Sequence, residues 1–449
     1  MRSRLATLHG DECDLLVLGG TVFAAAVAWQ AAAAGVRTVL ASEGDLAAAS
    51  AVRGRTWLER APILDPRSNR ADFDGELLER ENLLRAAAPF VRPAAVAVTL
   101  PDGKSARALL QQLRRAPRST LPPPALAHGG DGRRVEAFDG VVDEPALARA
   151  MAAAAVARGA RVVVHAACAG VAAAAVELRS RRDSEGARLR AKHILLAMDA
   201  DPSTVTTALQ AQPGGEWTAA ADVRCTAPHA DGGPAHVVAS ASGLAIAVPG
   251  HAHRHCRWLP RAPGVASADA EVDAGFAALG LLDGSPPRSV RSALPTRVAQ
   301  ASLACGALHE WPWRPAAAHA AAAAFVAARL GAAPLPVRAL GGAPAEPSDR
   351  LWRQYGWRAA LVRRHCAVDA AANELLCPHR PTQRGEVAFA MLEDGAIGFD
   401  DVLRRLNDDG LPCLLPECVA AAHAAYLRVV GRGEADDLAH AMAAFRAAP

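Results

Sequence analysis

Apolar and polar positions along the first forty residues switch from a short buried run to helical spacing and back. Residues 15–18 are apolar and lead into a glycine turn at 19–20, and an alanine-rich stretch then extends to Gly35, a residue type that commonly ends helices. A second run over 36–41, apolar apart from Arg37 and Thr38, ends beside Glu43. This order of strand, glycine turn, helix and strand outlines a dinucleotide-binding unit, in which glycines let the backbone approach a pyrophosphate at a helix N-terminus.

The same patterns predict further helices and strands. Leucine spacing and a proline stop predict a helix over 72–88, and a helix over 145–159 is predicted to be capped by Asp143 or Glu144. Further helices are predicted over 268–279 and 315–330. Apolar runs predict strands over 96–100, 162–164 and 194–198, and mostly strand structure over 223–261. Residues 104–135 carry several prolines and basic residues, so we expect an irregular surface connection there.

A proline- and glycine-rich stretch divides the last hundred residues from the rest. Residues 334–347 form this linker, and everything after it is predicted to be helical. We therefore expect an α/β fold with a Rossmann-like dinucleotide-binding unit and a separate all-helical C-terminal domain over 348–449.

Composition and charge narrow the class of protein. The chain has 449 residues, 51% hydrophobic and 21% charged, which is typical of a globular protein. A formal net charge of +3 gives no reason to expect nucleic acid as a partner. Nine scattered cysteines and the lack of a signal segment favour a reducing, cytoplasmic environment with free thiols. We predict no transmembrane helix, and peripheral contact with the inner face of a membrane stays open.

Several ordered segments resemble one known family. The N-terminal half contributes the opening unit through Glu43-Gly44-Asp45-Leu46-Ala47, then 79–85 with 88–93, and 138–143 leading to 157–160. The strongest matches lie at the helical end, in Arg353-Gln354-Tyr355-Gly356, Leu376-Cys377-Pro378, 386–390 and Asp401-Val402-Leu403-Arg404-Arg405. The whole chain resembles a divergent member of the FAD-dependent glycerol-3-phosphate dehydrogenase family, the quinone-linked aerobic type.

The resemblance implies FAD as cofactor and a small-molecule substrate. It also implies a Rossmann-like FAD-binding domain over 10–222 that resumes at about 285–333, with a β-rich substrate domain inserted over 223–284. In that family the flavin takes a hydride from carbon 2 of glycerol 3-phosphate, which gives dihydroxyacetone phosphate, and electrons pass to membrane quinone. An oligomer with itself or with another subunit is left open.

The phosphate turn departs from the usual fingerprint. Gly19 and Gly20 are present, whereas Thr21 replaces the second motif glycine and Ala24 the third. Alanine is tolerated at the third position, where helix and strand pack closely. A branched side chain at Thr21 weakens the approach of a pyrophosphate, although its hydroxyl could donate to a phosphate oxygen.

Two further cofactor positions are altered. A carboxylate at the end of the second strand should accept hydrogen bonds from the ribose, but that position is Ser42, with Glu43 one residue late and therefore facing the other way unless the strand end relaxes. The family's later flavin-contacting turn corresponds to Met198, Asp199 and Ala200. An acid at Asp199 would repel a pyrophosphate.

The substrate positions that the resemblance implies are also changed. The family's lysine turn would fall near 308–314, where Arg314 is the nearby cation, and Arg297 is the nearest replacement for an arginine that precedes a proline. Lysine occurs only at Lys104 and Lys192. With few cations to meet a phosphate and no evident base, we expect little or no glycerol 3-phosphate oxidation.

Two histidine and cysteine groups could bind metal, and in both cases we favour a structural interpretation. The histidines at 251, 253 and 255 with Cys256 fit an exposed hairpin edge. His365, Cys366, Cys377 and His379 lack a recognised zinc spacing, so helix packing and free thiols explain them better, and we predict no metal site.

Two functions of different class remain. The first is an active FAD-dependent oxidoreductase of altered specificity. The second is a catalytically inactive relative that keeps the fold as a scaffold or partner subunit. A fold alone does not decide between them.

Overall fold

The computed structural model describes most of the chain. The described residues are 5–47, 56–58, 81–85, 87, 89–114, 121–127, 132–172, 175–197, 218–226, 235–240, 243–249, 253–260, 289–294, 297–302, 307–312, 315–331, 333, 350–406 and 416–430. Of the predicted helix over 72–88, residues 81–85 are described and helical, and the predicted helix over 268–279 lies outside the described residues.

The first sheet is built around the opening strand. Its order is β17-β16-β10-β1-β2-β7, with strands at Ala307–Pro312, Arg297–Ser302, Gly186–Leu196, Glu12–Leu18, Thr38–Ala41 and Arg161–Val163. β1 pairs in parallel with both β10 and β2, and β2 with β7. β8 (Ala166–Ala172) and β9 (Ala175–Ser180) form a hairpin that extends from β10. The chain leaves β1 toward β2 on one side and returns to β10 on the other, so the carboxyl end of β1 is a topological switch point.

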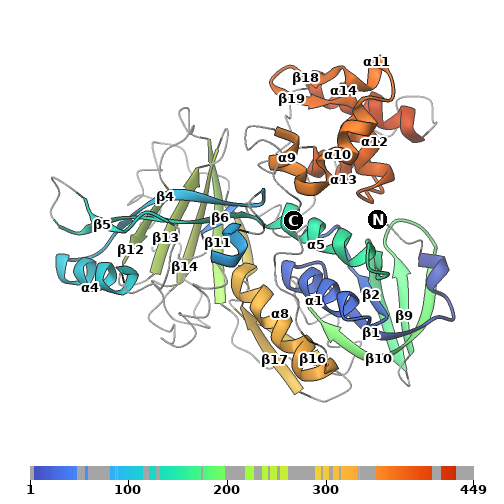
Figure 1. Cartoon of the computed structure of the whole chain (residues 1–449), viewed down its shortest axis with the longest axis horizontal. Helices are drawn as coiled ribbons and strands as arrows, with labels where there is room; N and C mark the ends of the chain where they lie inside the picture. Colours follow the sequence, from blue (N-terminus) through green and yellow to red (C-terminus); the bar gives the residue numbers. More distant parts are fainter. Residues whose placement is uncertain are drawn as a thin grey trace.

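Three helices pack together beside this sheet (Figure 1). α1 (Val22–Ala33) lies against both α5 (Glu144–Val156) and α8 (Pro315–Leu330). α1 is apolar on all sides and buried from Val22 to Ala32, as expected for a helix enclosed by neighbours. The predicted cap of α5 is confirmed, because the Asp143 side chain accepts a hydrogen bond from the Ala146 N–H.

The second sheet contains strands from distant parts of the sequence. Its order is β15-β11-β14-β13-β12-β4-β6-β3, with strands at Ser289–Leu294, Thr218–Thr226, His253–Pro260, Gly243–Pro249, Ala235–Ala239, Val91–Thr99, Arg134–Asp143 and Thr56–Leu58, and β5 (Ala125–Leu126) pairs with β6. β4 joins the strands of 56–143 to those of 218–294, since it pairs with β6 on one side and, in parallel, with β12 on the other. The domain boundaries stay predictions. The strands of this sheet lie on both sides of the boundary predicted at residue 222, and β11 spans it.

The irregular connection predicted over 104–135 is wrong in its first part. Residues Gly103–Arg114 form helix α4, which lies over one end of the second sheet (Figure 1). Ala106, Leu109, Leu110 and Leu113 recur at helical spacing and are buried in a cluster with the strands. The basic residues Lys104, Arg107 and Arg114 are exposed on the other face of α4. Their presence is therefore compatible with a helix and did not indicate a loop.

The strand that carries the first histidine group is not at a sheet edge. β14 pairs with β13 on one side and with β11 on the other, which corrects the predicted hairpin edge. β13 and β14, which flank the predicted turn, do pair antiparallel, but the pairing of β14 with the earlier strand β11 was not visible in local sequence. Backbone pairing on both sides places residues 254–256 inside the sheet.

The C-terminal domain is mainly helical, as predicted, and adds a short hairpin that the sequence did not predict. Its helices are α9 (Arg350–Tyr355), η4 (Gly356–Arg358), α10 (Ala359–Cys366), α11 (Ala370–Asn373), α12 (Arg384–Leu392), α13 (Phe399–Arg405) and α14 (Pro416–Val430). β18 (Leu375–Cys377) pairs with β19 (Arg380–Gln383). Within the described ranges, none of the helices has the length and apolar character needed to cross a bilayer.

Candidate dinucleotide site and the adjoining ion network

The glycine turn at the end of β1 has the geometry of a close backbone approach. Gly19 has a φ of 138°, in the region that favours glycine. At Gly20 a Cβ atom would lie 2.4 Å from Ser42 Oγ and 3.3 Å from the Asp45 carbonyl oxygen, so a side chain has no room there. Gly19 is therefore required by its backbone conformation and Gly20 by the packing of the turn, while their role toward a dinucleotide stays a prediction.

Thr21 is the N-cap of α1, and its hydroxyl hydrogen is already donated to another residue. Oγ1 accepts a hydrogen bond from the Ala24 N–H at 3.0 Å and donates to the Ala197 carbonyl oxygen at 3.1 Å. The second bond ties the helix start to the end of β10. The hydroxyl thus stabilises the turn itself, whereas we had considered it as a donor to a phosphate oxygen.

The end of β2 offers a hydroxyl where a carboxylate is usual. Ser42 is buried, with 3% of its surface exposed, and its Oγ lies against Gly20. Glu43 accepts a hydrogen bond from Arg181 in a largely exposed ion pair. The carboxylate that could have contacted a ribose therefore has an arginine partner.

FAD fits this site in part. The glycine turn, the capped helix start and the parallel strands suit a pyrophosphate, because helix N-termini present N–H donors and a positive dipole end. The ribose position lacks an unpaired acid. Arg297 begins β16 opposite Pro312, while Asp199, Ala200 and Arg314 lie outside the described residues, so the cofactor and substrate roles of all these residues stay predictions.

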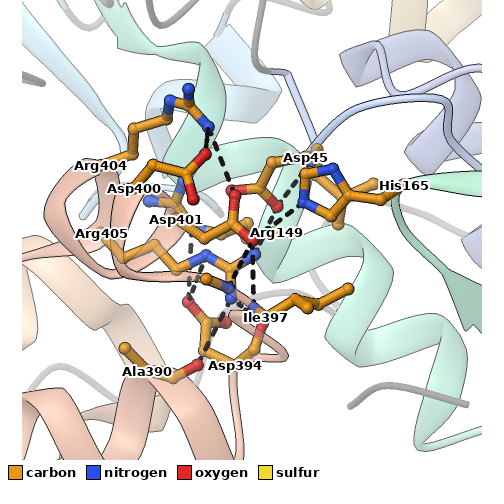
Figure 2. A network of polar contacts seen from close by, with 12 residues as sticks. Asp45, Arg149, His165, Ala390, Asp394, Ile397, Asp400, Asp401, Arg404 and Arg405 are labelled. Atoms are coloured by element: carbon orange, nitrogen blue, oxygen red, sulfur yellow. Dashed lines mark hydrogen bonds and ion pairs between the residues drawn. The ribbon is translucent and has the colours of Figure 1, made fainter. Parts of the chain in front are cut away.

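Beside the turn, a buried ion network joins the first domain to the C-terminal domain (Figure 2). Arg405 of α13 donates to Asp45, the residue that follows the β2 end by four positions, and both side chains are almost fully buried. Arg405 also donates to the Asp394 carbonyl oxygen at 2.6 Å. Arg405 therefore links the loop after β2 to the turn at Asp394 in the C-terminal domain.

Asp394 lies at the centre of this network. It pairs with Arg358, and its Oδ2 atom lies 3.5 Å from Nε of Arg149 on α5 and 4.0 Å from Nε of Arg405. Burial alone would raise the pKa of Asp394, but the three guanidinium groups outweigh burial and hold that pKa below its ordinary value. Asp394 is therefore a carboxylate that neutralises arginines from both domains.

A second part of the network reaches the hairpin of the first domain. His165 Nε2 lies 2.9 Å from Asp401 Oδ2, and Arg182 donates to both oxygens of Asp400 at 2.8 and 2.7 Å. Both carboxylates lie in the first turn of α13, where negative charge is favoured by the helix dipole. His165 has a φ of 56°, unusual for a non-glycine residue, so its backbone is held by the surrounding structure.

Inside the C-terminal domain a further buried group of polar residues connects α9 to α12. Tyr355 donates to Glu386 at 2.8 Å, and Gln354 donates to the Tyr355 hydroxyl at 3.0 Å and to the Arg405 carbonyl oxygen at 3.1 Å. Arg350 pairs with the same Glu386. Burial, and then the Glu386 charge, raise the pKa of Tyr355 well above its usual value, so Tyr355 stays protonated and acts as a donor.

Several residues of these networks lie in segments that carry the resemblance. Asp45 belongs to the run at 43–47, Tyr355 to the run at 353–356 and Arg405 to the run at 401–405. The segments at 43–47 and 401–405 therefore supply the buried ion pair that joins the two domains, a contact that the sequence did not predict.

Comparisons with known proteins identify the fold. No protein-family model matches the sequence, and no curated protein matches it. Among solved structures, a glycerol-3-phosphate dehydrogenase from Bacillus halodurans complexed with FAD is similar with a TM-score of 0.66 and 14% identity, covering 98% of this chain and 95% of that one. An L-proline dehydrogenase from P. horikoshii is similar with a TM-score of 0.54 and 14% identity, covering 73% and 96%. The chain therefore has the Rossmann-type fold of the FAD-dependent oxidoreductases, with a helical C-terminal region.

Proposed function

We propose that the chain binds FAD at the glycine turn and acts as an FAD-dependent oxidoreductase of the glycerol-3-phosphate dehydrogenase type. The observation that carries the proposal is the shape of the turn: Gly19 in a glycine-only conformation, Gly20 with no room for a side chain, and a capped helix start at Thr21. The nearly full-length likeness to an FAD-bound dehydrogenase supports it.

The protein's own residues would divide the work of binding. Backbone groups of the turn would face the pyrophosphate, and Ser42 would offer one hydroxyl toward the ribose, where a carboxylate normally offers two oxygens. The flavin would supply the hydride acceptor for a hydroxy or amino substrate. With Ser42 in place of an acid, we expect FAD to bind more weakly than it does through a carboxylate contact.

A second candidate function is an inactive scaffold, and two observations favour it. Glu43 is paired with Arg181, away from any ribose role. The lysines are also remote from the turn: Lys192 pairs with Asp14 at 2.7 Å, and Lys104 lies on α4. Among the described residues, no lysine therefore lies at the turn, where it could meet a substrate phosphate. The ion network, in contrast, holds the domains together.

The visible absorption spectrum of the purified chain distinguishes the two functions. A flavin band at near-stoichiometric occupancy, or one gained on adding FAD, supports the proposal. A colourless protein that ignores added FAD overturns it and leaves the scaffold. If flavin binds, bleaching of the band by glycerol 3-phosphate without oxygen identifies that substrate, and the absence of bleaching restricts the proposal to another hydroxy or amino substrate.

A matched pair of variants at Thr21 tests the location of FAD. Thr21→Asn keeps a cap acceptor for the Ala24 N–H and a donor for the Ala197 carbonyl, whereas Thr21→Asp has the same shape and keeps the acceptor, but adds a negative charge and loses the donor. If a pyrophosphate lies at this helix start, the Asp variant loses FAD affinity about tenfold or more relative to the Asn variant, which corresponds to about 1.4 kcal/mol. Equal affinities would place FAD elsewhere.

A further inference from the structure

Two cysteines and a histidine of the C-terminal domain converge on one point. Cys377 ends β18, His379 lies in the turn before β19, and Cys418 lies in the first turn of α14. Their potential ligand atoms all lie within 4.8 Å of one another, the only such group of three or more found in the described part of the chain. The sequence placed Cys377 and His379 with His365 and Cys366, but the fold brings in Cys418, which is 39 residues from His379.

The distances suit a shared tetrahedral ion. His379 Nδ1 lies 3.3 Å from Cys418 Sγ and 3.9 Å from Cys377 Sγ. Zinc bonds of about 2.3 Å to sulfur and about 2.0–2.1 Å to nitrogen, at tetrahedral angles, separate the ligand atoms by roughly 3.6 Å. One ring nitrogen facing two sulfur atoms at these distances requires only small shifts to surround a central ion.

Burial and chemistry point to the same kind of ligand. Both cysteines are 3% exposed and are not disulfide-bonded, whereas His379 is exposed. Thiolate and imidazole are the ligands that zinc prefers, and hard cations such as Mg²⁺ and Ca²⁺ take oxygen ligands instead. A thiolate pair closed off by an exposed imidazole leaves the fourth position toward solvent, where a water molecule can complete the coordination.

We propose that Cys377, His379 and Cys418 form a structural zinc site that fastens the β18–β19 hairpin to α14. These elements pack side by side at the far end of the C-terminal domain (Figure 1). The hairpin strands are three and four residues long, so a cross-link to α14 would stabilise a sheet that is too short to be stable alone. The site is remote from the glycine turn and does not depend on FAD binding.

Zinc content and stability of the full-length protein test the proposal. Protein purified under reducing conditions and dialysed with Zn²⁺ should retain one zinc per chain by elemental analysis, and chelation should lower its Tm, with Zn²⁺ restoring the Tm. Co²⁺ in place of Zn²⁺ should give a thiolate-to-metal charge-transfer band. His379→Ala should abolish retention and the Tm response, and because His379 is exposed this variant should remain folded by circular dichroism.

Variants and controls separate the proposed site from other outcomes. Cys418→Ser should behave like His379→Ala, whereas Cys168→Ser, which changes a free thiol outside the cluster, should keep zinc and its stabilising effect. Three results would overturn the proposal: no zinc retained by the wild type, zinc retained equally by His379→Ala, or a Cys377–Cys418 disulfide in protein purified without reductant and treated with Zn²⁺. The last result would assign the pair a redox role.

Discussion

Arg405 and Asp45 form a buried ion pair although 360 positions separate them in the sequence. Their side chains are 1% and 2% exposed, and the pair joins the loop after β2 to the last turn of α13. The same arginine donates to the Asp394 and Ala390 carbonyl oxygens. A glycine turn at the switch point and a helical domain are thus connected through one side chain, so damage to the ion pair should be felt in both.

Replacing Arg405 by methionine should destabilise the protein strongly. The change keeps an apolar stem but leaves Asp45 buried without its cation, and removing one partner of a buried pair typically costs about 3–5 kcal/mol. Urea unfolding followed by circular dichroism measures the cost. Arg181→Gln is the matched control, because the Arg181–Glu43 pair is exposed and should contribute about 0–1 kcal/mol. Similar costs for the two variants would show that the buried pair does not hold the domains together.

Acid should weaken the network at a defined carboxylate. Burial would raise the pKa of Asp401, but the hydrogen bond with His165 and the charges of Arg405 and Arg182 outweigh it, so the folded-state pKa lies below the ordinary carboxyl value of about 3.9. A depressed pKa stabilises the fold above the unfolded-state pKa, and this stabilisation is lost as the pH falls through the folded-state pKa.

The change Asp401→Asn removes that titration. The stability difference between wild type and variant should be largest above about pH 5 and should shrink as the pH falls below about 4. Urea unfolding at a series of pH values measures it. A difference that stays constant over this range would mean that ionised Asp401 does not stabilise the fold.

The contact between the glycine turn and the end of β2 should appear as coupling between two small substitutions. Gly20→Ala places a methyl group 2.4 Å from Ser42 Oγ and should cost about 1–3 kcal/mol. Ser42→Ala removes the nearest atom, so the double variant should be less destabilised than the sum of the single variants. Denaturant unfolding of the four proteins gives the coupling energy. Additive costs would show that the methyl group is accommodated by a movement of the backbone elsewhere.

Local sequence patterns predict the elements that depend on neighbouring residues. The β1-α1-β2 unit, α5 with its Asp143 cap and α8 over Pro315–Leu330 follow from apolar runs, capping residues and glycine or proline stops. Such signals act over a few residues. They could not predict that β14 lies between β11 and β13, nor that β4 pairs with β12, because pairing partners far apart in the sequence leave no local periodicity.

The candidate site shows the same division. Gly19 and Gly20 are recognisable because they follow an apolar strand and precede a helix, which is a local pattern. Two contacts depend on segments that lie more than a hundred residues later in the sequence. These are the hydrogen bond from the Thr21 hydroxyl to the Ala197 carbonyl oxygen and the ion pair of Glu43 with Arg181. The residue types at these positions therefore predicted which groups could contact a cofactor. Tertiary contacts determine which partners those groups have in the fold.

Gly356 of the C-terminal domain combines a left-handed backbone with a close contact to another part of the chain. It has a φ of 59°, and a Cβ atom there would lie 2.7 Å from Phe90 Cζ, at the contact with the segment that enters β4. Gly356→Ala should cost about 2–5 kcal/mol, the sum of a left-handed backbone at about 1–2 kcal/mol and overpacking at about 1–3 kcal/mol. Gly331→Ala is the matched control, because Gly331 has a φ of 63° but nothing within 4 Å of its Cβ position.

Urea unfolding of the two alanine variants separates the backbone cost from the packing cost. Gly331→Ala should show the backbone cost alone, and the excess cost of Gly356→Ala should fall when Phe90→Leu is added, since leucine lacks the ring atoms that a methyl group at 356 would meet. Equal costs at the two glycines would mean that the C-terminal domain can move away from Phe90 without loss. The Phe90 contact would then not fix the position of this domain, and the ion network around Arg405 would have to hold it in place.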